Sequence, residues 1–209
     1  MEIFPGIHQL KVPIPDNPLG YLNSYLLQGE DGWLMVDTGW NVDDAYDSLR
    51  QQLEAIGLDF AQVSQIVVTH MHFDHYGLAE RIKRVSPAKV AYHRIEKEIF
   101  ETIINDRKQV HTRALEMLGS HGVPQTELTA PRPAQMSAAM DSIIWPDRSL
   151  EDGDEVSTGL FRLQVIRTPG HSRGHICLYE PDKKFLLAGD HILPIITPNI
   201  SYHAFSGPN

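Results

Sequence analysis

The segment Thr69-His70-Met71-His72-Phe73-Asp74-His75 places three of the chain's 11 histidines within six residues. It follows the run QIVVT at residues 65–69, which predicts a strand buried on both faces. In an extended segment, side chains two residues apart point the same way, so His70 and His72 can hold one metal ion. Asp74 and His75, one turn further on, can face a second ion. A cluster of this density is typical of a metal site, because a loop that only caps a helix needs one histidine at most.

Two further candidate ligands also follow predicted strands. His171 lies in the turn Thr168-Pro169-Gly170-His171, where proline and glycine allow the backbone to bend sharply. Asp190 follows the run FLL at residues 185–187, and a carboxylate at a strand end can bridge two cations. We interpret His175 as a structural histidine bonded to the turn, not as a ligand. Strand ends along one sheet edge are where such sites assemble. The predicted metal ligands are His70, His72, Asp74, His75, His171 and Asp190.

Composition limits the class of protein. The 209 residues are 42% hydrophobic, which is enough to bury the core of a domain. The formal net charge of −9 repels polyanions, so we expect no nucleic-acid partner. The single cysteine, Cys177, excludes an intramolecular disulfide and fits a reducing compartment. Residues 1–17 lack the pattern of a signal peptide, and no run reaches the roughly 20 apolar residues of a membrane span. We therefore expect a cytoplasmic protein without a membrane partner.

The hydrophobic pattern favours a mixed α and β fold. The chain begins with short runs typical of antiparallel strands, with a hairpin turn between Gly29 and Gly32. Helical and strand patterns then alternate, which favours a partly parallel sheet covered by helices. Asn41 is the expected cap of the first helix and Gly57 its end. Strands are predicted at residues 7–14, 24–27, 33–36, 65–69, 89–92, 161–167, 175–179 and 184–188, and helices at residues 41–56, 76–85, from 95 onward and at 110–118.

Residues 129–146 interrupt this regularity. Pro131, Pro133 and Pro146 lie among small residues there, which predicts a long connection, and strand patterns resume after it. Such a loop is a candidate lid. We therefore expect one domain over residues 1–209, with a helical and loop insert at residues 94–150 that covers the site.

From about Ile7 to Pro198 the chain resembles the metallo-β-lactamase superfamily of metal-dependent hydrolases. The His-x-His-x-Asp-His signature of that superfamily is intact at residues 70–75 and is highly specific. The Thr-Pro-Gly-His turn at His171 and the Gly-Asp pair at Asp190 follow in the right order. Val-Asp-Thr-Gly at residues 36–39 looks like the superfamily's first motif.

The resemblance implies a four-layer αββα sandwich with a two-metal site on one edge. In the family pattern Asp37 is hydrogen-bonded beneath the site and is not a ligand. The imidazole-rich, thiolate-free donor set suits two zinc ions, with iron or manganese as alternatives. One metal would be held by His70, His72 and His171, the other partly by Asp74 and His75, with Asp190 bridging the two.

This site implies a hydrolase that needs no serine or cysteine nucleophile. Metal ligation lowers the pKa of water from about 15.7 toward 7, so a metal-bound hydroxide can attack a carbonyl that a metal polarises. Asp74 would be the catalytic residue that orients the hydroxide. The expected substrate is a small ester, thioester or lactone, as in the glyoxalase II and lactonase branches. Cys177 is interpreted as a small core residue.

The superfamily normally carries one more histidine, well beyond the bridging aspartate, that completes the shell of the second metal. Here the sequence ends at Asn209, so we expect the C-terminal strand and helix elements to be missing and the chain to be a fragment of a longer enzyme. The alternative is that His203 or His191 takes this role. An unpaired sheet edge would invite a second copy, which predicts a homodimer.

Two other functions remain open. A mononuclear iron thiol dioxygenase of the same fold would use only His70, His171 and Asp190. A catalytically inert fragment or an interaction module would keep the scaffold without turnover. The acidic balance argues against the RNA-processing branches, and the flavodiiron motif carries glutamate at the position of His72.

Overall fold

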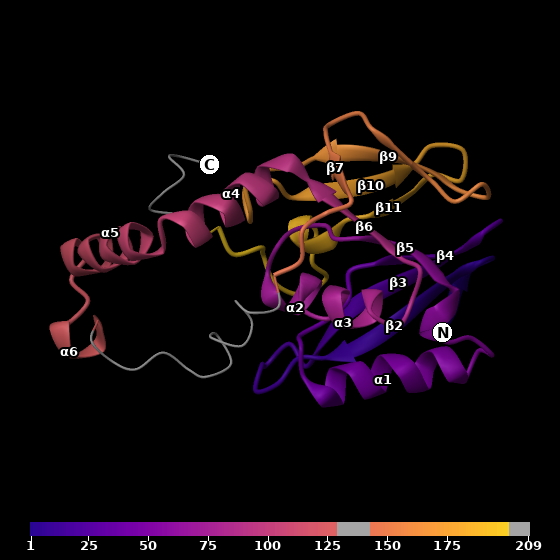
Figure 1. Ribbon diagram of the computed structural model, residues 1–209, viewed down its shortest axis with the longest axis horizontal. Helices are drawn as coiled ribbons and strands as arrows, with labels where there is room; N and C mark the ends of the chain where they lie inside the picture. The colour runs from indigo at the N-terminus through magenta and orange to yellow at the C-terminus, as the bar shows by residue number, and fades with distance from the viewer. Residues whose placement is uncertain (129–142, 201–209) are drawn as a thin grey trace.

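A computed structural model describes residues 1–128 and 143–200 of the chain (Figure 1). Within these residues the strands form two sheets, one with the order β1-β2-β3-β4-β5-β6-β7 and one with the order β11-β10-β9-β8. The strands of the first sheet are β1 (Glu2–Phe4), β2 (Ile7–Pro13), β3 (Tyr21–Gly29), β4 (Gly32–Val36), β5 (Val63–Val67), β6 (Lys89–His93) and β7 (Arg148–Leu150). Those of the second sheet are β8 (Glu155–Ser157), β9 (Arg162–Arg167), β10 (Ile176–Glu180) and β11 (Phe185–Leu187).

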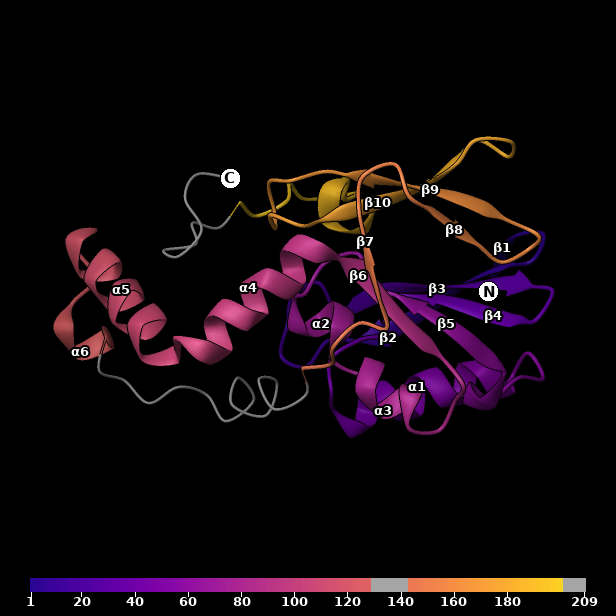
Figure 2. The same ribbon diagram turned by 45° about the horizontal axis from the view of Figure 1, so that its top comes forward.

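The helices fall into two sets. Figure 2 shows α1 and α3 against the first sheet, on the side away from the second sheet, whereas α4, α5 and α6 extend away from both sheets. Short helical turns α2, η1 and η2 connect the strands. The α-helices are α1 (Asp43–Glu54), α2 (Phe73–Tyr76), α3 (Ala79–Lys83), α4 (Arg94–Asn105), α5 (Arg107–Ser120) and α6 (Gln125–Leu128), and the 3-10 helices are η1 (Phe60–Gln62) and η2 (Gly189–His191).

Two separate hydrophobic cores define the layers. One lies between the first sheet and its helices, and Leu26 of β3 packs there with Leu49 of α1. The other lies between the sheets, where Leu27 of β3 packs with Leu163 of β9. Because neighbouring residues of a strand point to opposite faces, the adjacent leucines of β3 serve different cores. Within the described residues no helix covers the outer face of the second sheet (Figure 2). The predicted mixed α and β sandwich is confirmed, and within the described residues it has three layers, α, β and β.

The first sheet changes from antiparallel to parallel at β4. Strands β1 to β4 pair antiparallel, and Gly29 lies opposite Gly32, which confirms the predicted hairpin. Strands β4 to β7 pair parallel, so their carboxyl ends lie at one edge of the sheet. Asp37, Val68 and Arg94 therefore begin the segments that leave the sheet at that edge.

Several predicted boundaries were wrong. Helix α1 begins at Asp43, and Val42 rather than Asn41 is its N-cap. The predicted helix 76–85 is two short helices, α2 and α3, because Leu78 donates its N–H to Gly39 O instead of continuing α2. Strands β1, β7 and β8 were not predicted, since three residues are too few to show an alternating pattern.

It stays a prediction that residues 94–150 form an insert that covers the site. Its residues 129–142, which contain most of the predicted lid, lie outside the described residues. Strand β7, at its end, pairs with β6 and belongs to the first sheet. None of the described helices combines the length and apolar character needed to cross a bilayer. The cytoplasmic location and the homodimer also stay predictions.

The core between the sheets leads to a prediction about stability. Leu163 is fully buried there, whereas its neighbour Gln164 is exposed. We expect Leu163→Ala to lower the free energy of unfolding by about 2–5 kcal/mol, because it leaves a cavity. Gln164→Ala should change it by no more than about 0.5 kcal/mol. Equal effects in urea denaturation would contradict this assignment of the core.

Candidate metal centre

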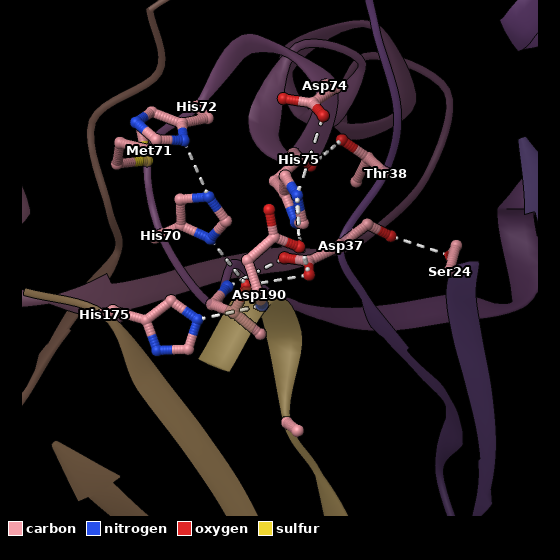
Figure 3. Close-up of polar contacts among 12 residues, drawn as sticks. Ser24, Asp37, Thr38, His70, Met71, His72, Asp74, His75, His175 and Asp190 are labelled. Atoms are coloured by element: carbon pink, nitrogen blue, oxygen red, sulfur yellow. Dashed lines mark hydrogen bonds and ion pairs between the residues drawn. The ribbon is translucent and has the colours of Figure 1, made fainter. Parts of the chain in front are cut away.

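Three segments meet where the parallel strands of the first sheet end (Figure 3). All the predicted metal ligands lie in these segments: His70, His72, Asp74 and His75 after β5, His171 between β9 and β10, and Asp190 in η2. Five of these six residues have ligand atoms that form two groups, each within 4.8 Å, whereas Asp74 belongs to neither group. The first ligand group is His70, His72 and His171, and the second ligand group is His70, His75 and Asp190. The two sheets therefore contribute to one centre.

The first ligand group has the dimensions of a metal site. His70 Nε2 lies 3.0 Å from His72 Nδ1 and 3.1 Å from His171 Nε2. Two nitrogens on a tetrahedral zinc ion with ordinary bond lengths are about 3.3 Å apart. The three imidazoles converge on one point at nearly the spacing that a small cation requires.

Hydrogen bonds outside the group fix the tautomers of two of these rings. The hydroxyl of Thr69 donates to Asp37 Oδ2, so toward the ring of His70 its oxygen can only accept, from Nδ1–H. His171 Nδ1 donates to Asn199 O at 2.6 Å. In each neutral ring Nε2 is then unprotonated and faces the other, which is unfavourable without a positive charge between them. Burial and the neighbouring histidines hold the pKa of His70 well below its usual range. The donor set fits a divalent cation.

The second ligand group contains one carboxylate, that of Asp190. Asp190 Oδ1 lies 3.3 Å from His75 Nε2, and Asp190 Oδ2 lies 3.3 Å from His171 Nε2. One oxygen of Asp190 thus faces each group, which is the arrangement of a bridging carboxylate. Asp74 Oδ2 lies 3.8 Å from His75 Nε2, and the Asp74 side chain is 25% exposed. Asp74 is therefore at the rim of the centre, within reach of solvent.

The charges of the second ligand group favour a cation at this place. Burial lowers the pKa of His75, but the carboxylates of Asp37, Asp190 and Asp74 outweigh burial and raise it well above its usual range. Burial raises the pKa of Asp190, but hydrogen bonding and charge attraction from His75, with His171 and His72, bring it to about 2. Positive charge beside Asp190 is thus stabilised, whether a proton on His75 Nε2 or a metal ion supplies it.

Asp37 orients the histidines from beneath. Its carboxylate accepts hydrogen bonds from Thr69 N, Thr69 Oγ1 and His75 Nδ1, each at 2.8 Å. The bond from Nδ1 directs Nε2 of His75 into the centre. Asp37 has a φ of 59°, which aspartate tolerates better than most residues, and its carbonyl accepts from Ser24 Oγ. Asp37 lies where the resemblance predicted it, hydrogen-bonded below the ligands.

His175 positions Asp190 by accepting a hydrogen bond from the backbone N–H of Asp190. The ring is fully buried, Nδ1 donates to Thr168 Oγ1 at 2.8 Å, and Nε2 accepts from Asp190 N at 3.1 Å. Both ring nitrogens are occupied, in accord with the prediction of a structural histidine. Gly189 makes this contact possible, because a Cβ there would lie 2.7 Å from His175 Nε2 and its φ is +50°. The thiol of Cys177 is buried nearby, and burial raises its pKa, as expected for a core residue.

The proposed replacement histidines differ in position. His191 is exposed and belongs to neither ligand group, although its ring centroid lies 6.2 Å from that of His175. His203 lies outside the described residues. Within residues 1–128 and 143–200, the second ligand group therefore has no further histidine than those already named.

The sequence prediction missed several supporting residues. Thr38 donates both its backbone N–H and its hydroxyl to the carbonyl of His75, and Ser24 supports Asp37. Glu96, on α4, is buried against two of the ligand segments. One signal was available for Glu96, because it lies four residues before Phe100 on the apolar side of its helix, where a charged residue is unusual.

A cavity of about 500 Å³ lies beside the second ligand group. Asp74, His75 and Asp190 form part of its wall. The remainder comes from both sheets and from the segment after η2, and it includes Gln9, Asn23, Tyr25, Leu22, Leu186, Leu187, Ile192 and Leu193. A small molecule with an apolar part and a polar group could bind there next to the ligands.

Comparisons with known proteins give a consistent result. Residues 17–208 match the family described as the metallo-beta-lactamase superfamily. The chain is 32% identical over 181 residues to the human acyl-coenzyme A thioesterase MBLAC2, covering 80% of this chain and 57% of that protein. It is 27% identical over 187 residues to the probable metallo-hydrolase YqjP of Bacillus subtilis, covering 88% and 56%. The chain thus spans a little over half the length of these relatives.

A solved structure supports the same family. The metallo-beta-lactamase family protein TTHA1429 from Thermus thermophilus superimposes with a TM-score of 0.81 at 31% identity, covering 98% of this chain and 65% of that one. The family match includes all three ligand-bearing segments. The chain belongs to the metallo-beta-lactamase superfamily.

Proposed function

We propose that this chain carries the metal centre of a hydrolase that cleaves a small ester, thioester or lactone with the help of two zinc ions. The observation that supports this most is the pair of adjacent ligand groups, with the two oxygens of Asp190 directed at different groups. Relatives named as an acyl-coenzyme A thioesterase and a probable metallo-hydrolase favour the same class of reaction.

Divalent cations bound there would make water nucleophilic near neutral pH and would polarise the carbonyl under attack. The residues of the chain supply position and proton transfer. Asp37 and Thr69 keep the rings of His75 and His70 in the required tautomers. Asp74, at the exposed rim and 3.8 Å from His75, is placed to orient a water in the cavity and to accept its proton.

The cavity supports a substrate with an acyl group. Leu186, Leu187 and Ile192 offer apolar surface beside Asp190, while Asn23 and Tyr25 offer polar groups on the facing sheet. An acyl chain would contact the leucines while its carbonyl approaches the metal centre. This arrangement suits a thioester or ester better than a negatively charged polymer, since the whole chain is acidic.

Replacement of His72 tests the proposed centre. We expect His72→Ala to reduce bound zinc per chain, measured by elemental analysis, and to lower hydrolysis of a short acyl thioester by about 100-fold or more, since it removes one ligand of the first group. His121→Ala, an exposed histidine at the end of α5, should leave both unchanged.

Three outcomes would contradict parts of this proposal. Unchanged zinc content and activity in His72→Ala would exclude the ligand assignment. One iron per chain, together with oxidation of a thiol, would favour the mononuclear dioxygenase that uses His70, His171 and Asp190. Tight zinc binding without hydrolysis of any acyl substrate would favour the inert module.

Asp37→Asn tests the orientation of His75. The amide can present only one accepting oxygen, so its NH₂ group would face a donor, either Thr69 or His75 Nδ1–H. When the NH₂ group faces His75, that ring can bond to it only with its proton on Nε2, which blocks that nitrogen as a ligand. We expect zinc affinity to fall about 10- to 100-fold in competition with a chelator. Asp47→Asn, exposed on α1, is the control, and equal affinities in the two variants would refute this role.

A further inference from the structure

Glu96 connects two of the ligand segments. It lies in the first turn of α4 and is only 4% exposed. Its Oε1 accepts hydrogen bonds from Gly174 N, at 2.6 Å, and from the hydroxyl of Ser172. Its Oε2 accepts from Met71 N at 3.2 Å. One carboxylate thus receives three hydrogen bonds from two segments that are far apart in the sequence.

The donors lie directly beside the ligands of the first group. Met71 is the residue between His70 and His72, and Ser172 follows His171. Both segments are irregular at these positions, and the backbone hydrogen bond that joins them, from Ile176 N to Thr69 O, lies at their ends and not beside His72 and His171. A side-chain bridge from a third element can fix the distance between them there, because hydrogen bonds to an ionised carboxylate are short and strong.

The packing around Glu96 is adapted to this bridge. A Cβ at position 174 would lie 2.7 Å from Glu96 Cγ and 2.9 Å from Glu96 N, so only glycine allows this close approach. The N–H groups at the start of α4 also favour a negative charge in its first turn. His93 caps that helix by accepting from Ile95 N, which holds the first turn in place.

We propose that Glu96 is a positioning residue that sets the separation between His171 and the pair His70 and His72, and so the affinity of the first ligand group for its metal. This inference rests on the proposed metal centre. In this proposal Glu96 contacts neither the metal nor the substrate. Glu96 acts through the backbone of Met71 and through Ser172 and Gly174.

The test compares zinc affinity with folding. Glu96→Gln keeps the shape of the side chain but turns an NH₂ group toward one of the donors, which breaks the bridge to one segment. We expect zinc affinity, measured by competition with a chelator, to fall about 10- to 100-fold. The absorption spectrum of the cobalt-substituted protein should also change, because the geometry of the three histidines changes. Glu101→Gln on the same helix, where Glu101 pairs with Lys97 at the surface, should alter neither.

Ser172→Ala gives an independent variant with a smaller change. It removes one donor to Glu96, so we expect a smaller loss of affinity in the same direction. Combined with Glu96→Gln it should add less than the sum of the two effects, since both act through one bridge. If Glu96→Gln does not fold, Ser172→Ala alone decides, and an unchanged affinity and cobalt spectrum would overturn the proposal.

A purely structural role predicts a different result. In that case Glu96→Gln would lower the free energy of unfolding of the metal-free protein while the folded variant kept its zinc affinity and cobalt spectrum, and the proposal would be wrong. Zinc binding is measured without turnover, so the two proposals can fail separately. If zinc affinity depends on Glu96 but the protein hydrolyses nothing, the proposed reaction is wrong and the role of Glu96 is supported.

Discussion

The hydrogen bonds to Asp37 are the constraint on which the metal centre depends. An imidazole can bind a metal only through an unprotonated nitrogen. The proton of each neutral ring must therefore be on the other nitrogen, which donates a hydrogen bond to a partner outside the site. Asp37 accepts a hydrogen bond from Nδ1–H of His75, and through the hydroxyl of Thr69 it fixes the ring of His70. A single buried carboxylate, held on a backbone with positive φ, thereby determines two of the ligand orientations.

The fold brings this carboxylate to the ligands because β4 and β5 are parallel neighbours. Their pairing places Val36 beside Val67, so the next residues of both strands leave the sheet together and Asp37 reaches Thr69. The other predicted ligands come from the second sheet, so the core between the sheets and the hydrogen bond from Ile176 N to Thr69 O bring His171 and Asp190 to His70. The centre is therefore a property of the assembled sandwich and of no single segment.

The candidate ligands could be predicted from the sequence because their chemistry is local. Three histidines within six residues, and a glycine before Asp190, are visible without any knowledge of the fold. The supporting contacts were invisible for the opposite reason, since Ser24 and Glu96 act on residues distant in the chain and carry no motif of their own. The division of the helix after His75 was missed because a tertiary bond from Leu78 to Gly39 outweighs helical periodicity.

Two buried carboxylates lie beside the segments that carry the predicted ligands. Asp37 and Glu96 are both nearly excluded from water and each accepts three hydrogen bonds from the ligand segments. Neither carboxylate is hydrated by solvent. The negative charge of each is therefore stabilised by its hydrogen-bond donors and by any positive charge among the histidines. A divalent ion held by the histidines and Asp190 would add positive charge near these hydrogen-bonded segments, which would couple metal binding to the order of both segments.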